Sequence, residues 1–116
     1  MTNVPKSLSV TSLNDWLKSD SDNPIIIDVR ENNEIDIAYL NFVDHYIPMS
    51  KVSLDYVYSQ IGSYSNKEFV IICHRGIRSF SFARWLLENK IVTEVWNLEG
   101  GIEDWSIHID SNIPRY

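Results

Sequence analysis

One segment of the chain combines residue types that could carry out nucleophilic sulfur chemistry. It reads Cys73-His74-Arg75-Gly76-Ile77-Arg78-Ser79, and it follows an apolar run and precedes a helical pattern. The first N–H groups of a helix lack internal partners and carry partial positive charge, so they stabilise a thiolate placed just before them. Arg75 and Arg78 add two positive charges, and Gly76 allows the backbone to turn its N–H groups inward.

The single cysteine has two interpretations, a buried apolar residue that ends a strand or a reactive thiolate. The glycine, the two arginines and the helix start favour the thiolate. The backbone of residues 74–79 could also hold the outer sulfur of a persulfide, Cys–S–S⁻, by hydrogen bonds. His74 either tunes the thiolate or projects into solvent, and these alternatives stay open. Ser79 is predicted to cap the helix and to add a hydrogen bond into the loop.

Composition narrows the class of protein. The 116 residues, 44% of them hydrophobic, fit one domain with one core. A net charge of −6 argues against nucleic acid and against an anionic membrane surface as partners. A lone cysteine excludes an intramolecular disulfide, and the sequence contains neither a membrane-span-length apolar run nor a signal-peptide pattern, so we expect a cytoplasmic location. No metal-ligand spacing or nucleotide motif is present, so we expect neither a metal nor an organic cofactor.

Short apolar runs alternate with helical patterns, which predicts an α/β fold: a small parallel β-sheet flanked by helices on both faces. Buried strands are predicted at residues 25–29, 69–73 and 94–98, with a brief strand at 45–47. Helices are predicted at about 11–18, 31–40, 50–60, 79–88 and 102–106. Residues 1–7 are predicted to be an N-terminal extension and residues 8–116 the domain.

Ligands of a parallel sheet bind beyond the carboxyl ends of its strands. Cys73 follows one predicted strand, and Asp28 and Arg30 stand at the same end of another, so we expect all three at one edge of the sheet. Asp28 and Arg30 are predicted to form an ion pair that braces the cysteine loop. The alternatives are a structural surface pair, or an Arg30 that binds an anionic donor.

Four blocks of the sequence resemble the rhodanese-like family. The cysteine loop resembles the active-site loop of single-domain rhodaneses, with a glycine three residues after the cysteine and Arg-Ser just behind it. The other blocks, in the family's order, are D-V-R-E at 28–31, I-P at 47–48, and V-W-N-L-E-G-G-I at 95–102 followed by Trp105. Residues 39–44 depart from the family's Gly-His-Ile-Pro-Gly-Ala, and His45 is out of register, so the role of the family's histidine is not transferred to it.

The resemblance implies a sulfurtransferase of the rhodanese type. Cys73 would accept a sulfane sulfur from thiosulfate or a related small anionic donor, with Arg75 and Arg78 attracting that donor. The resulting persulfide would pass its outer sulfur to a thiol, a protein cysteine or, in an assay, cyanide.

Loop length favours this chemistry over a second candidate, a cysteine phosphatase or arsenate reductase on the same fold. Four residues separate Cys73 from Arg78. The oxyanion-cleaving members of the family have a loop one residue longer, since a tetrahedral oxyanion needs a wider ring of N–H groups than a single sulfur atom. A non-catalytic interaction module is the third candidate.

Overall fold

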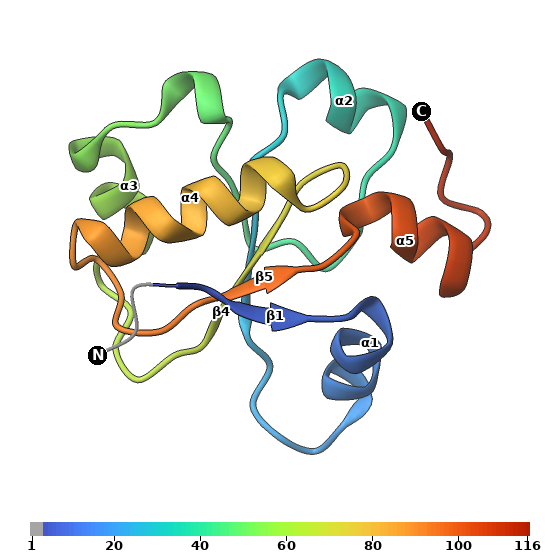
Figure 1. Cartoon of the computed structure of the whole chain (residues 1–116), viewed down its shortest axis with the longest axis horizontal. Helices are drawn as coiled ribbons and strands as arrows, with labels where there is room; N and C mark the ends of the chain where they lie inside the picture. Colours follow the sequence, from blue (N-terminus) through green and yellow to red (C-terminus); the bar gives the residue numbers. More distant parts are fainter. Residues whose placement is uncertain (1–3) are drawn as a thin grey trace.

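Five parallel strands form one sheet, in the order β1-β5-β4-β2-β3 (Figure 1). The computed structural model describes residues 4–116. The strands are β1 (Lys6–Leu8), β2 (Ile25–Asp28), β3 (His45–Tyr46), β4 (Phe69–Ile72) and β5 (Trp96–Leu98). Central β4 pairs with β2 on one side and with β5 on the other. The predicted fold class, a parallel sheet flanked by helices, is confirmed.

Helices cover both faces of the sheet (Figure 1). On one face lie α1 (Val10–Lys18) and α5 (Gly101–His108), and on the other lie α3 (Leu54–Ile61) and α4 (Ile77–Glu88). The short helix α2 (Asn32–Ile37) follows β2, and a 3-10 turn, η1 (Met49–Lys51), follows β3. No helix in the described part of the chain is long and apolar enough to cross a lipid bilayer.

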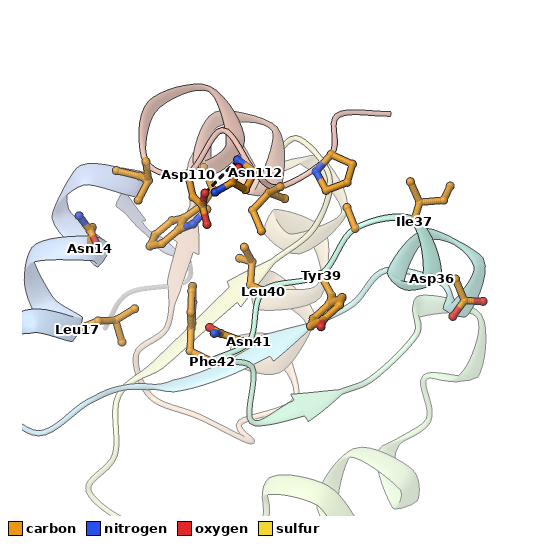
Figure 2. Close-up of a pocket in the computed structure, with 15 residues that line it drawn as sticks. Asn14, Leu17, Asp36, Ile37, Tyr39, Leu40, Asn41, Phe42, Asp110 and Asn112 are labelled. Carbon is orange, nitrogen blue, oxygen red and sulfur yellow. Dashed lines mark hydrogen bonds between the residues drawn. The ribbon is translucent and has the colours of Figure 1, made fainter.

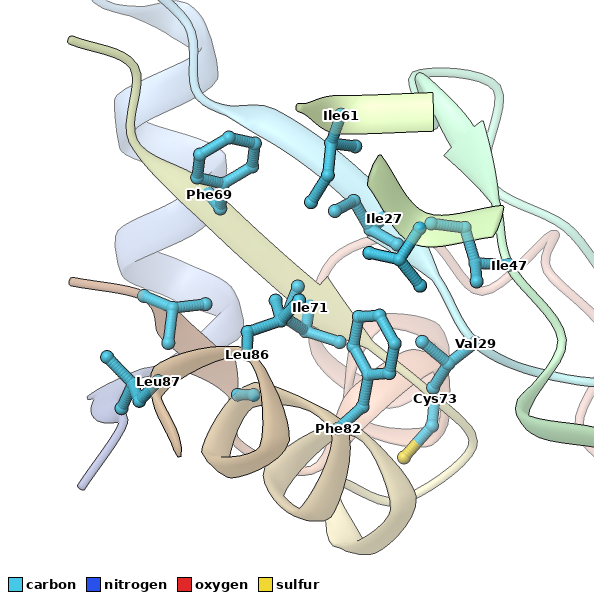
Figure 3. Close-up of a cluster of buried hydrophobic side chains, with 13 residues drawn as sticks. Ile27, Val29, Ile47, Ile61, Phe69, Ile71, Cys73, Phe82, Leu86 and Leu87 are labelled. Atoms are coloured by element: carbon cyan, nitrogen blue, oxygen red, sulfur yellow. The ribbon is translucent and has the colours of Figure 1, made fainter. Parts of the chain in front are cut away.

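Neighbouring side chains along β2 and β4 belong to two different cores. Ile27 and Ile71 pack against α3 and α4 (Figure 3), whereas Ile26 and Val70 pack on the α1–α5 face. All four are buried. Strands covered on both faces show continuous apolar runs, which is why these two were predictable. Cys73 lies at the end of the first core, where β4 stops (Figure 3).

The predicted N-terminal extension is wrong in part. Lys6 and Ser7 belong to β1, which pairs with β5, and the Lys6 N–H also donates to the Val95 carbonyl at 2.9 Å. Residues 6 and 7 are polar and therefore lack the apolar pattern that predicts a buried strand. Residues 1–3 of the predicted extension lie outside the described residues.

Several helix boundaries also differ from prediction: α2 ends at Ile37 instead of residue 40, and α5 continues to His108 instead of ending at residue 106. The helix predicted at 50–60 is split into η1 and α3, because Ser53 acts as an N-cap and accepts from the Tyr56 N–H at 3.1 Å. The helix predicted at 79–88 begins at Ile77, directly after Gly76. The cysteine loop is therefore shorter than the sequence pattern suggests.

Asp28 and Arg30 form an ion pair with no exposed surface at the end of β2. Arg30 Nε donates to both carboxylate oxygens at 3.1 and 3.2 Å, and Nη2 donates to Oδ2 at 2.9 Å. Burial lowers the pKa of Arg30, but the hydrogen bonds and charge of Asp28 outweigh it, so the pKa is raised overall. The alternative of a surface pair is wrong.

Removing one partner of this pair leaves a buried charge unpaired. We expect Asp28→Asn to lower the free energy of unfolding by about 3–5 kcal/mol in urea denaturation. The control is Glu88→Gln, which breaks the exposed Arg84–Glu88 pair and should change stability by less than about 0.5 kcal/mol. Equal effects of the two substitutions would show that the Asp28–Arg30 pair contributes no more than a surface contact.

Candidate active site

Cys73 lies between the end of β4 and the start of α4. Gly76 is the N-cap of α4 with φ +94°, in the left-handed region that favours glycine. This conformation turns the Gly76 N–H toward Cys73 Sγ, to which it donates at 3.1 Å. Cys73 is 1% exposed, yet it lines a pocket of about 310 Å³ together with His74, Arg75, Ile77 and Arg78.

Ser79 supplies a second polar contact to the sulfur. Its Oγ lies 3.2 Å from Cys73 Sγ and donates to Asn97 Oδ1 at 2.5 Å. Asn97 Nδ2 in turn donates to the Gly76 carbonyl at 3.1 Å. The predicted helix-cap role of Ser79 is wrong, because Gly76 is the N-cap and Ser79 is buried within the first turn of α4. A contact from Ser79 into the loop is present.

The first turn of α5 holds the backbone of the cysteine loop. The N–H groups of Ile102 and Glu103 donate to the carbonyls of Cys73 and His74, both at 3.0 Å. Gly101 has φ +56°, and a Cβ at this position would clash with the same two carbonyl groups. The Gly-Gly turn after β5 is thus part of the support of the site.

The two arginines of the loop differ in their pairing. Arg78 makes a two-pronged ion pair with Glu34 of α2, at 2.6 and 2.8 Å. Arg75 is exposed and forms no ion pair within residues 4–116. The expectation that both arginines present free positive charge to a donor is therefore revised. Arg75 keeps that role as a prediction, while Arg78 ties the loop to α2.

A hydrogen-bond network joins the buried Asp28–Arg30 pair to the loop. The Tyr116 hydroxyl accepts from Arg30 Nη1 at 2.9 Å and donates to Glu34 Oε2 at 2.9 Å. Glu34 then holds Arg78. The Asp28–Arg30 pair therefore connects to the loop through Tyr116 and Glu34. Since Arg30 is fully buried, the alternative in which it binds an anionic donor is wrong.

His74 is held against the C-terminal segment. Its ring stacks on Tyr116 with centroids 4.0 Å apart and an interplanar angle of 10°. Burial lowers the pKa of His74, and the charge of Arg75 lowers it further, so the neutral imidazole is favoured at pH 7. His74 Nε2 lies 3.9 Å from Glu103 Oε1, beyond hydrogen-bond reach. Projection into solvent is thus wrong, and a tuning role stays a prediction.

The sequence analysis did not identify three residues that support the cysteine loop: Glu34, Asn97 and Tyr116. Asn97 lies inside the 95–102 block, and Glu34 closes a capping box with Glu31 at the start of α2, so both carried a local signal. Tyr116 carried none, because its partner Arg30 is 86 residues away.

A larger groove of about 680 Å³ lies away from the cysteine loop, between α1, α5 and residues 36–42 (Figure 2). Leu40 and Phe42 help to line it, and Phe42 packs on Trp105 with ring centroids 5.0 Å apart. The segment that departs from the family pattern therefore shapes this groove. His45 contacts the Tyr64 hydroxyl at 2.8 Å and belongs to no part of the site.

The described residues offer no cluster of three or more His, Cys, Asp or Glu side chains that could hold a metal ion.

The fold and the pocket define an α/β domain whose cysteine loop joins a central parallel strand to a helix. Residues 9–108 match the rhodanese-like domain family, and the chain belongs to that family. The resemblance of the four sequence blocks is thereby confirmed.

Individual relatives agree with this assignment. The chain is 34% identical over 100 residues to the rhodanese-like/PpiC domain-containing protein 12, chloroplastic, of Arabidopsis thaliana, covering 78% of this chain but only 30% of that protein. It is 30% identical over 104 residues to the putative sulfurtransferase YtwF of Bacillus subtilis, covering 86% and 89% of the two chains. The crystal structure of a rhodanese-like domain protein from Staphylococcus aureus matches with a TM-score of 0.70 and 28% identity, over 96% and 98% of the two chains.

Glu34 makes stability depend on pH in the acid range. The hydrogen bonds from Arg78 lower its pKa to about 2, against burial that acts in the opposite direction. Because this value lies below that of the unfolded chain, the ionised carboxylate contributes stability that is full above about pH 5 and lost as the pH falls toward 2. We expect Glu34→Gln to reduce the free energy of unfolding by about 2 kcal/mol at pH 7, allowing for solvent at the partly exposed Arg78, and by almost nothing at pH 2.

Urea denaturation between pH 7 and pH 2 measures this difference. Asp36→Asn removes an exposed carboxylate from the same helix and should keep the wild-type pH dependence. If wild type and Glu34→Gln lose stability in parallel as the pH falls, Glu34 is not the group responsible.

Proposed function

We propose that this chain is a sulfurtransferase that carries a sulfane sulfur on Cys73 as a persulfide. The main support for this proposal is the hydrogen bond from the Gly76 N–H to Cys73 Sγ, at 3.1 Å. It lies at the N-terminus of α4, and Cys73 lines a pocket there. This placement favours negative charge on sulfur. Family membership and the similarity to a putative sulfurtransferase of Bacillus subtilis support the same chemistry.

The first half-reaction loads the sulfur. The Cys73 thiolate attacks the outer sulfur of a donor such as thiosulfate, and a new S–S bond forms. The S–S bond of the donor breaks, and its electron pair leaves with sulfite, so that Cys73 holds Cys–S–S⁻. Two anions meet in this step, and the exposed Arg75 and the positive end of α4 reduce their repulsion.

The second half-reaction transfers the outer sulfur from Cys73 to an acceptor. A thiolate, a protein cysteine or cyanide attacks the outer sulfur, the S–S bond to Cys73 breaks, and the electron pair returns to Cys73 as thiolate. Ile77, 75% exposed, lines the pocket, so an acceptor approaches from open surface. Neither half-reaction needs an organic cofactor, and the two steps predict ping-pong kinetics.

The short loop favours sulfur over phosphate or arsenate as the transferred group. Cys73 and Arg78 enclose four residues, and Glu34 already occupies the guanidinium of Arg78. An oxyanion would have to displace that carboxylate. We place this activity in the cytoplasm, where a lone cysteine stays reduced.

A steady-state assay tests the proposed function. Wild-type protein with thiosulfate and cyanide should release thiocyanate, with parallel double-reciprocal lines. Cys73→Ser, which keeps the size of the side chain, should lower turnover by at least about 10³-fold, because the hydroxyl is not ionised at neutral pH.

Ser65→Ala, at an exposed loop position, serves as the control and should retain full turnover. An aryl phosphate ester offered to the same preparations should not be hydrolysed. Cys73-dependent hydrolysis of that ester, without thiocyanate release from any sulfane donor, would move the assignment to a phosphatase.

A further inference from the structure

We propose that Asn97 is a positioning residue that directs the hydroxyl proton of Ser79 and thereby sets the reactivity of Cys73. Asn97 lies on β5, is 2% exposed, and has both ends of its amide engaged. Nδ2 donates to the Gly76 carbonyl at 3.1 Å, and Oδ1 accepts from Ser79 Oγ at 2.5 Å. Because the Gly76 carbonyl can only accept, it fixes which end of the amide faces Ser79.

The Ser79 hydroxyl has one proton and two neighbours that could receive it. When the Ser79 hydroxyl donates its hydrogen bond to Asn97 Oδ1, the lone pairs of Ser79 Oγ point toward Cys73 Sγ, 3.2 Å away. That arrangement suits a protonated thiol, which donates its S–H to the oxygen. A thiolate instead requires the hydroxyl proton to turn to sulfur, and the buried Oδ1 is then left without a donor, which is unfavourable. Asn97 therefore favours the thiol over the free thiolate.

The persulfide has no such conflict, and this step rests on the proposed function. In Cys–S–S⁻ the charge lies on the outer sulfur, and Sγ is bonded on both sides. Ser79 can then keep its bond to Asn97. The free thiolate is thus the one form of Cys73 for which Asn97 gives up a hydrogen bond, so the resting cysteine is held less reactive than its position at the N-terminus of α4 would make it.

Other titratable and charged groups surround the cysteine loop. His74, Arg75 and Arg78 line the pocket with Cys73, Glu34 of α2 pairs with Arg78, Glu103 of α5 lies 3.9 Å from His74, and the Asp28–Arg30 pair lies at the end of β2. Among the described residues, none of these side chains hydrogen-bonds to Asn97 or Ser79. A substitution at Asn97 therefore reaches the sulfur through Ser79 or through the Gly76 carbonyl.

Two substitutions of similar size separate these two routes. Asn97→Leu and Asn97→Asp both remove the donor to the Gly76 carbonyl, but only Asn97→Asp keeps an acceptor for Ser79. We expect the rate of Cys73 alkylation by iodoacetamide at pH 7, without any sulfur donor, to rise about tenfold in Asn97→Leu. The alkylation rate should fall several-fold in Asn97→Asp. Relative to wild type, the pH profile of alkylation should move to lower pH in Asn97→Leu and to higher pH in Asn97→Asp. The carboxylate of Asn97→Asp also disfavours a nearby thiolate through its charge, so Asn97→Leu is the deciding variant. An alkylation rate that stays unchanged or falls in Asn97→Leu would overturn the proposal.

The second test uses Ser79→Ala as background. There, Asn97→Leu should leave the alkylation rate unchanged within about twofold, since no hydroxyl proton remains to be redirected. A tenfold increase that persists without the Ser79 hydroxyl would overturn the proposal. Circular dichroism and thermal melting verify folding, and Asn97→Ala replaces Asn97→Leu if the latter does not fold. Alkylation is independent of sulfur transfer, so failure here and failure of the proposed function give separate results.

Discussion

The Gly76 N–H points at Cys73 Sγ where Gly76 adopts a left-handed backbone conformation at the start of α4, and contacts from β5 and α5 hold the backbone around it. Asn97, on the neighbouring strand β5, holds the carbonyl of the same residue. The first turn of α5 holds the carbonyls of Cys73 and His74. In the cycle proposed above, Cys73 alternates between thiolate and persulfide, and donors already in place avoid a reorganisation that would slow both half-reactions.

Behind this loop, charged side chains form a chain of contacts from the buried Asp28–Arg30 pair to the partly exposed Arg78. Asp28 neutralises Arg30, the Tyr116 hydroxyl bridges Arg30 to Glu34, and Glu34 fixes Arg78. The chain joins β2, the C-terminal segment, α2 and α4, which are far apart in the sequence. Its effect on the chemistry is indirect: it immobilises Arg78 and leaves Arg75 as the loop arginine with a free charge in the described part of the chain.

The sequence was informative wherever a short-range pattern determined the structure. The apolar runs of β2 and β4, buried on both faces, predicted the sheet, and the cysteine loop lies where it was expected, between a buried strand and a helix. Residues 6 and 7 were assigned to the N-terminal extension because Lys6 and Ser7 carry no apolar pattern, and their place in β1 comes from pairing with β5. Tyr116 and the Glu34–Arg78 pair were missed for a related reason, since contacts between distant segments leave no mark in local spacing.

Intact mass spectrometry of the protein after incubation with thiosulfate tests the central claim most directly. Wild type should gain one sulfur atom, about 32 Da, which a reducing agent or cyanide removes, and Cys73→Ser should gain none. That result would place the transferred sulfur on Cys73. A protein whose thiol titrates normally but which gains no sulfur from thiosulfate, or from any other sulfane donor, would contradict the account.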